Sequence, residues 1–153
     1  MTALTSAQPI FTIRADLGEI MRFGATPYGE RRVIDILGGC VEGPKLSGRI
    51  LPGGADWQIV RADGVVHLTA RYTVETNSGG QVLIDAEGYR HGPPEVMARL
   101  ARDETVDPSL YYFRTFMRFE TADPAASWLN RILGIGFGAR QKGAVRIEVF
   151  EVL

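Results

Sequence analysis

The sequence predicts a mainly β protein, folded as a single antiparallel β-barrel of about eight to ten strands with two short helices. Three observations support this fold class. Short runs of β-branched and aromatic residues recur along the chain, turn signals such as Asp63-Gly64 separate several of them, and strands do not alternate regularly with helices. Antiparallel hairpins of this kind close into a barrel or fold as a sandwich, and a barrel of about eight strands can enclose one small ligand.

Length and composition predict one globular domain. The chain has 153 residues, of which 45% are hydrophobic and 23% charged, so it can bury a core without disulfides or a metal. Residues 1–8 lack a strand or helix pattern, and we expect them to form a flexible tail. Residues 9–153 are then the barrel domain.

The expected strands are the segments rich in alternating or β-branched residues. They cover residues 9–14, 31–37, 46–51, 57–61, 65–76, 81–90, 109–121 and 144–152, and residues 16–23 either extend the first strand or turn at Gly18. The glycine-rich stretch 38–43 lacks the spacing of a phosphate-binding loop. Glycine at this density in an all-β pattern indicates bulges or a close approach of backbone or ligand.

Two segments have helical signals. Residues 95–103 follow a proline pair and carry one apolar stripe, while residues 123–134 begin with a capping Asp123 and Pro124 and end at Gly134. Both helices are short, so we expect them to lie beside the barrel.

Alternation along the long strands divides their residues between two faces. In segment 65–76 one face carries Val66, Leu68, Ala70, Tyr72 and Val74, and the pattern does not decide which face lines the interior. Segment 109–121 has aromatic residues on both faces. We therefore expect it to be a central strand that is covered on both sides.

The loop at residues 51–57 is the strongest functional signal. Its proline and paired glycines predict a sharp turn that brings Asp56 and Trp57 side by side between two strands. A carboxylate beside a large aromatic ring is unfavourable in a core and common in a ligand pocket. Alternatively, Asp56 bonds to its own backbone and Trp57 belongs to the core.

Charge and motif content exclude several function classes. The net charge is −1 without a basic cluster, which argues against nucleic acid or an anionic membrane as a partner. A single cysteine, Cys40, and two histidines, His67 and His91, predict no disulfide and no metal site. Nucleotide and serine-hydrolase motifs are absent, so we expect no cofactor. No signal peptide or apolar span is visible, and a cytoplasmic location follows as an expectation.

The remaining candidates are polar groups on strands with apolar faces. An arginine would hold an anionic or carbonyl oxygen, and a carboxylate whose pKa is raised by burial would move a proton. The candidate catalytic residues are Asp56, Tyr112 and Arg114. The candidate ligand-binding residues are Trp57, Arg71, Tyr72, Glu87, Trp128 and Asn130. The alternative is structural pairing of arginines with carboxylates across the sheet.

Several motifs together resemble a known family. They are Gly38-Gly39, Gly43-Pro44, Leu51-Pro-Gly-Gly-Ala-Asp-Trp57, Asp63-Gly64, Ala70-Arg-Tyr72, Tyr111-Tyr-Phe-Arg-Thr115 and Trp128-Leu-Asn130. In this order they resemble the bacterial and fungal family called domain of unknown function 3237, over residues 11–152. The resemblance implies a small single-domain β-barrel and carries no assigned catalytic role for any residue.

Three functions are compatible with these observations. The first is a cofactor-independent cyclase, isomerase or lyase that acts on a small cyclic or aromatic carbonyl compound by acid–base chemistry. The second is a carrier that binds a small hydrophobic molecule without converting it. The third is a packed barrel that forms a homodimer through Tyr111, Phe113 and Phe119 on its aromatic strand.

Overall fold

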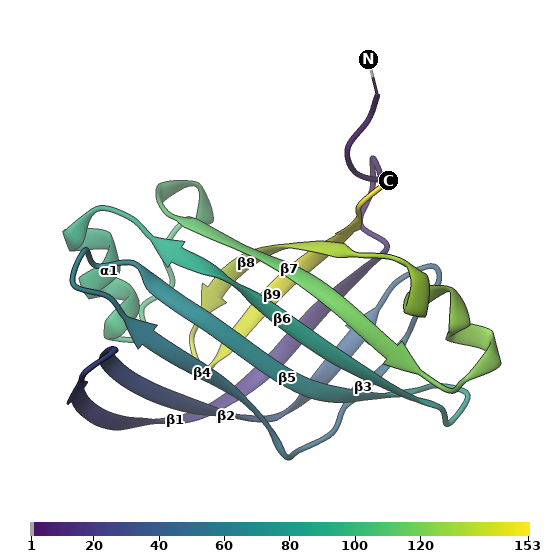
Figure 1. Ribbon diagram of the computed structural model, residues 1–153, viewed down its shortest axis with the longest axis horizontal. Coiled ribbons are helices and arrows are strands. Elements are labelled where there is room, and N and C mark those ends of the chain that lie inside the picture. The colour runs from purple at the N-terminus through teal and green to yellow at the C-terminus, as the bar shows by residue number, and fades with distance from the viewer. Residues whose placement is uncertain (1) are drawn as a thin grey trace.

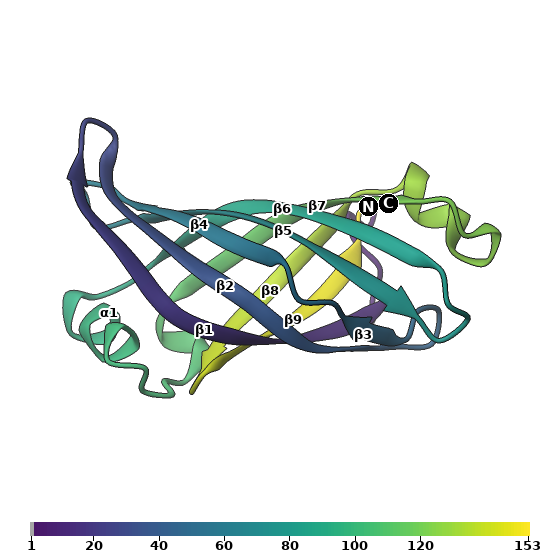
Figure 2. The ribbon, with the colours of Figure 1, turned by 90° about the horizontal axis from the view of Figure 1, so that it is seen from below.

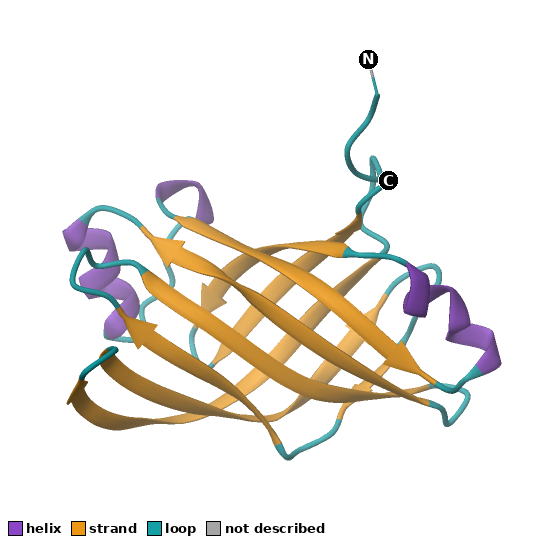
Figure 3. Ribbon diagram, viewed as in Figure 1, coloured by secondary structure: helices purple, strands orange, loops and turns teal. Residues whose placement is uncertain are grey.

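The computed structural model describes residues 2–153 and consists mainly of β-strands (Figures 1 and 3). The strands are β1 (Phe11–Thr26), β2 (Gly29–Glu42), β3 (Gly48–Ile50), β4 (Gly54–Val60), β5 (Val66–Thr76), β6 (Gln81–His91), β7 (Tyr112–Thr121), β8 (Gly134–Gln141) and β9 (Ala144–Glu151). The helical elements are α1 (Pro94–Ala101) and the 3-10 helices η1 (Pro108–Leu110) and η2 (Pro124–Arg131). Both predicted helical segments are present, as α1 and η2.

Eight of the strands close into an antiparallel barrel. Each of β4 to β8 pairs with the next strand along the chain, β2 pairs with both β1 and β4, and β9 returns to pair with β1. The short β3 lies outside this ring of eight and pairs with the C-terminal ends of β2 and β5 (Figure 2). The predicted antiparallel barrel is therefore confirmed.

Bulges shape the long hairpin of β1 and β2. β1 continues without a turn through Gly18, and its register with β2 shifts at Asp16/Leu17 and again before Ile20. Gly39 has a φ of +132°, and a side chain there would collide with the carbonyl oxygen of Arg14. The glycine-rich stretch thus allows the strands to bulge and their backbones to approach closely, as the sequence indicates.

Buried apolar side chains of β1, β2, β5, β6, β7 and β9 form most of the core. The larger cluster includes Phe11, Ile84 and Met117. A smaller cluster joins Val96 and Leu100 of α1 to the barrel. α1 and η2 lie at opposite ends of the barrel (Figure 1). No helix within residues 2–153 is long and apolar enough to cross a membrane.

The prediction that the aromatic strand is covered on both sides is wrong. On β7 the side chains of Tyr112 and Phe116 are 46% and 45% exposed, whereas Phe113 and Phe119 are buried in the barrel. Closure of the barrel leaves each strand one outward side, and the groups that contact the outer face of β7 are neighbours in the same sheet, such as Phe137 of β8 and His91 of β6. Tyr111, Phe113 and Phe119, from which a dimer interface was inferred, face inward.

The two ends of the chain lie together. Thr5 forms a β-bridge with Val152, and the amide of Ser6 donates to the carbonyl of Glu151 at 2.9 Å. Figure 1 shows both termini at the same side of the barrel. Part of the segment expected to be a tail is therefore attached to the end of the last strand.

Candidate functional site

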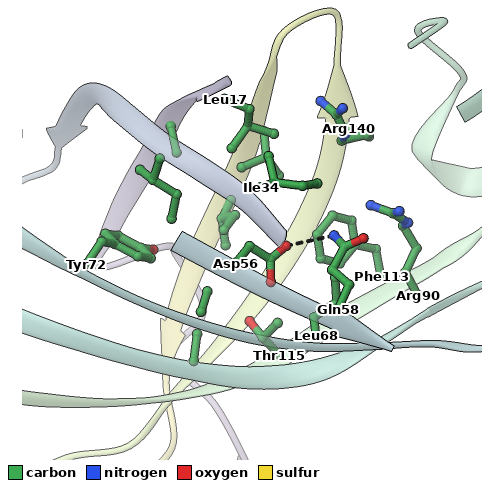
Figure 4. A pocket seen from close by; sticks show the side chains of 16 residues that line it. Leu17, Ile34, Asp56, Gln58, Leu68, Tyr72, Arg90, Phe113, Thr115 and Arg140 are labelled. Atoms are coloured by element: carbon green, nitrogen blue, oxygen red, sulfur yellow. Dashed lines mark hydrogen bonds between the residues drawn. The ribbon is translucent and has the colours of Figure 1, made fainter. Parts of the chain in front are cut away.

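A cavity lies inside the barrel, and all eight strands of the closed ring contribute to its wall (Figure 4). Its volume is about 50 Å³. This space holds several water molecules or a compact organic group. Most of the lining is apolar, and the polar members are Asp56, Gln58, Tyr72, Arg90, Thr115 and Arg140.

The segment predicted as a loop at residues 51–57 places Asp56 and Trp57 on opposite faces of the barrel wall. The turn through Pro52 and Gly53 ends earlier than the sequence suggests, and β4 begins at Gly54. Neighbouring residues of a strand point to opposite sides, so Asp56 faces the cavity while Trp57 is 41% exposed outside. The prediction that both side chains share one pocket is therefore wrong.

Gln58 connects Asp56 to a buried arginine. It lies two residues after Asp56 on the same inner face of β4, and its side chain is almost completely buried. Arg32 donates from Nη2 to Gln58 Oε1 at 2.7 Å, and Gln58 Nε2 donates to Asp56 Oδ2 at 2.8 Å. Because Arg32 can only donate, it fixes the orientation of the amide and directs the NH2 group at Asp56.

Burial raises the pKa of the Asp56 carboxyl above its ordinary value of 3.8. The hydrogen bond from Gln58 and the positive charges of Arg90, Arg32 and Arg140 oppose this shift without overcoming it. Asp56 Oδ1 is buried and has no hydrogen-bond partner within residues 2–153. One oxygen of the carboxyl is thus held by the protein while the other is available to a ligand.

Arg90 places a guanidinium group in the wall of the cavity. It follows the inward-facing Ile84, Ala86 and Gly88 at the end of β6, and it lies over the ring of Phe113 at 5.5 Å. Burial lowers the pKa of Arg90 to about 10, so the group remains charged at neutral pH. Within residues 2–153 its guanidinium takes part in no hydrogen bond or ion pair, and its Nε is buried.

Tyr72 and Thr115 add two hydroxyl groups to the wall. Burial raises the pKa of Tyr72, so its phenol stays protonated and able to donate. Figure 4 shows Tyr72 on one side of Asp56, with Gln58, Arg90 and Phe113 on the other. Neither Tyr72 Oη nor Thr115 Oγ1 has a hydrogen-bond partner within residues 2–153.

Arg140 lies at the edge of the cavity, and its contacts with the protein mainly stabilise the fold. Its Nη1 donates to the carbonyls of Gln141 and Ala144 at 3.0 and 2.9 Å. Its Nη2 lies 3.3 Å from Asp103 Oδ1, just after α1. These contacts tie the β8–β9 turn to the end of α1, and they neutralise Arg140 more completely than Arg90 or Arg32.

The predicted catalytic residues Tyr112 and Arg114 lie outside the cavity. Both are on the outer face of β7, where the Arg114 guanidinium is 4.1 Å from the Phe137 ring and 5.5 Å from the Tyr112 ring. Arg114 Nη1 also donates to the carbonyl of Phe113 at 2.9 Å. Since inward and outward residues alternate, their neighbours Phe113 and Thr115 face the cavity instead.

Two predicted ligand-binding residues form cross-strand pairs on the outer surface. Arg71 Nε lies 3.8 Å from Asp85 Oδ2, and Glu87 Oε1 lies 2.8 Å from His67 Nε2. These contacts correspond to the alternative interpretation, in which charged side chains pair across neighbouring strands and stabilise the sheet. Of the nine predicted site residues, the structure brings Asp56 and Tyr72 together in the cavity wall.

Trp128 and Asn130 belong to η2, at the far end of the barrel. Trp128 packs against the main core, and Lys45 Nζ lies 5.2 Å from its ring centre. Asn130 uses its amide to pair with the backbone of Thr121: Oδ1 accepts from Thr121 N at 2.8 Å, and Nδ2 donates to Thr121 O at 2.9 Å. The geometry of Asn130 therefore attaches η2 to the end of β7.

We expect Asn130→Ala to lower the free energy of unfolding by about 1 kcal/mol, because two exposed hydrogen bonds to the backbone of Thr121 are lost. Urea denaturation followed by circular dichroism measures this change. Asn77→Ala is the matched control, since the exposed side chain of Asn77 makes no hydrogen bond within residues 2–153. Equal stability of the two variants would contradict an anchoring role for Asn130.

The sequence analysis missed Arg32, Gln58, Arg90, Thr115 and Arg140. A signal for Arg90 is present, because it continues the face of Val82, Ile84 and Ala86 at a spacing of two. Gln58 likewise shares its face with Asp56. No group of three or more His, Cys, Asp or Glu side chains within residues 2–153 is close enough to hold a metal ion.

Comparison with known proteins identifies the family. The model of a family described as "Protein of unknown function (DUF3237)" matches residues 5–152. The chain belongs to this family. A relative, a UPF0311 protein of Rhodopseudomonas palustris, is 43% identical over 153 residues, which is 100% of both chains. The resemblance inferred from the motifs is thus confirmed at the level of family.

Solved structures of similar proteins have the same barrel. A crystal structure from R. palustris superposes with a TM-score of 0.91 at 42% identity, covering 100% of each chain. A "beta-barrel like protein" from Acinetobacter baumannii gives 0.85 at 37% identity, covering 100% of this chain and 99% of that one. A structure described as an enzyme from Penicillium herquei gives 0.72 at 15% identity, covering 100% and 98%. At that identity the likeness shows the fold alone.

Proposed function

We propose that the barrel binds a small organic molecule in its interior and that Asp56 exchanges a proton with it. The observation that carries this proposal is the clustering of polar atoms without partners. Five buried side-chain polar atoms have no hydrogen-bond partner within residues 2–153, and four of them belong to residues of the cavity wall: Asp56 Oδ1, Tyr72 Oη, Arg90 Nε and Thr115 Oγ1. Leaving one such atom unpaired costs about 1–3 kcal/mol, so their concentration at one site favours a ligand that pairs with them.

The residues of the cavity wall are best suited to acid–base chemistry. A carboxyl with a raised pKa lies closer to the operating pH, where it transfers protons more efficiently than an ordinary aspartate. Gln58 holds Asp56 Oδ2 and leaves Oδ1 for the substrate. Tyr72 can donate to a carbonyl oxygen of the same molecule. We therefore propose a cofactor-independent cyclase, isomerase or lyase that acts on a small cyclic or aromatic carbonyl compound.

In this proposal, Tyr72 and Arg90 take the roles that the sequence analysis gave to Tyr112 and Arg114. The reason is position: the first pair lies in the cavity wall with Asp56, and the second pair lies on the outside of β7. The Penicillium herquei protein, which is described as an enzyme, has a barrel of this fold, and this is consistent with the proposal. Fold likeness by itself assigns no reaction.

A thermal-shift screen of the purified chain tests the binding step. The panel contains cyclic enones, lactones, small aromatic acids and fatty acids, and it is run on the wild type, Asp56→Asn and Asp35→Asn. Asp35 is the control because it is exposed on the outer face of β2, one strand away from Asp56. A ligand at a hundred times its dissociation constant adds about 2.7 kcal/mol of stability. We expect this gain in the wild type and Asp35→Asn, and a smaller gain in Asp56→Asn.

Mass spectrometry of the ligand after long incubation tests the chemical step. An enzyme converts the ligand in the wild type and not in Asp56→Asn. A ligand that binds and returns unchanged would identify a carrier and exclude the proposed catalysis. A complete lack of binding by the folded wild type would contradict the proposed use of the cavity.

A further inference from the structure

Charge is distributed unequally inside the barrel. Among residues 2–153, Arg32, Arg90 and Arg140 are buried, and their positive charges act on the Asp56 carboxyl in the cavity wall. Asp103 and two carbonyl groups compensate Arg140, and Gln58 accepts one hydrogen bond from Arg32. The interior therefore contains more positive than negative charge, and this excess is least compensated at Arg90.

Asp56 does not neutralise Arg90. No nitrogen of Arg90 lies within 4.0 Å of a carboxylate oxygen among residues 2–153, although both side chains belong to the same cavity wall. A buried guanidinium without an acceptor is strongly unfavourable, and a carboxylate that binds it through charged hydrogen bonds removes most of the penalty. The arrangement thus favours an acceptor supplied from outside the chain.

The surroundings of Arg90 limit the form of that acceptor. Phe113 covers its guanidinium at 5.5 Å, and most of the remaining wall is apolar, with Leu68, Ala70 and Ile147 among its members. A volume of about 50 Å³ admits a compact group only. The ligand that fits has one charged oxygen group at Arg90 and a small hydrocarbon part among the apolar side chains.

We infer that the ligand of this barrel is a small carboxylic acid, bound as its carboxylate to Arg90 with its hydrocarbon part against the apolar wall. This inference rests on the proposed use of the cavity as a binding site, and it narrows the ligand to an anion. Asp56 in its protonated form donates from Oδ1 to the same carboxylate or to a neighbouring carbonyl oxygen. Tyr72 and Thr115 provide further donors.

Matched pairs of acids and amides test the charge of the ligand. Isothermal titration at neutral pH compares acetate and crotonate with acetamide and crotonamide, which have nearly the same shape without the charge. Inorganic phosphate is included as an anion without a hydrocarbon part. We expect at least one acid to bind about tenfold to hundredfold more tightly than its amide and than phosphate, because a hydrogen bond between charged groups contributes that much to affinity.

Variants of Arg90 locate the binding site. Arg90→Met is expected to remove the preference for the acid, while Arg90→Lys, which keeps the charge, retains part of it. Arg118→Met is the control, because Arg118 is 67% exposed on the outer face of β7. Circular dichroism confirms that each variant is folded. If Arg90→Met does not fold, the comparison of acids with amides in the wild type and in Arg90→Lys still tests whether the ligand binds as a carboxylate at Arg90.

Each outcome has a distinct meaning. Equal binding of acids and amides, or equal binding of phosphate, would overturn the carboxylate inference. Binding of neutral enones or lactones without binding of any acid would also overturn it, and the proposed function would stand. If the folded wild type binds neither the acids nor any compound of the thermal-shift panel, the proposed function itself fails.

Discussion

Gln58→Leu is expected to lower the free energy of unfolding by about 3–5 kcal/mol. The variant removes the amide that accepts from Arg32 Nη2 and donates to Asp56 Oδ2. Both partners lie in the interior of the barrel, so each loses a hydrogen bond where the protein provides no replacement and bulk water has little access. Breaking a buried charged network in this way is strongly destabilising, and the additional apolar surface of leucine does not offset it.

Urea denaturation of Gln58→Leu measures this effect. Gln81→Leu is the matched control, because Gln81 is exposed at the start of β6 and its side chain makes no hydrogen bond within residues 2–153. We expect the control to remain within about 0.5 kcal/mol of the wild type. A similarly small change in Gln58→Leu would mean that Arg32 and Asp56 find other partners, and the described network would then be incorrect.

The stability of the wild type relative to Asp56→Asn is expected to fall as pH rises. Burial raises the pKa of Asp56 above 3.8, so the native state holds its proton more firmly than the unfolded chain does. The resulting stabilisation is fully present below the unfolded pKa and is lost as pH rises through the native pKa. Asparagine has nearly the same shape and does not titrate. Each unit by which the native pKa is raised changes this difference by about 1.4 kcal/mol.

Denaturation at a series of pH values, with an NMR titration of the carboxyl, measures this dependence. Asp63→Asn provides a control of opposite sign, because the hydrogen bond from Arg61 lowers the pKa of Asp63. The stability of the wild-type protein relative to Asp63→Asn is therefore expected to rise with pH. If Asp56 behaved like Asp63, the charges of Arg90 and Arg32 would outweigh burial, and a catalytic role as a tuned acid would lose its basis.

The local pattern of the sequence determined the barrel and part of its site. Hairpin signals and β-branched runs predicted the antiparallel strands, and capping residues with prolines predicted the segments that form α1 and η2. Asp56 was identified as a site residue because a carboxylate beside a large aromatic ring is unfavourable in a core, and Tyr72 because it is a polar group on a strand with an apolar face.

The tertiary structure alone decided which face of each strand points inward. Alternation assigns residues to two faces, but β7 carries aromatic residues on both, so the pattern does not distinguish Arg114 from Thr115. Closure of eight strands selects the face that buries the most apolar surface together with its neighbours. That choice depends on residues far apart in the chain. It brought Arg90 of β6 into the same wall as Asp56 of β4 and left Arg114 and Tyr112 on the outer face of β7.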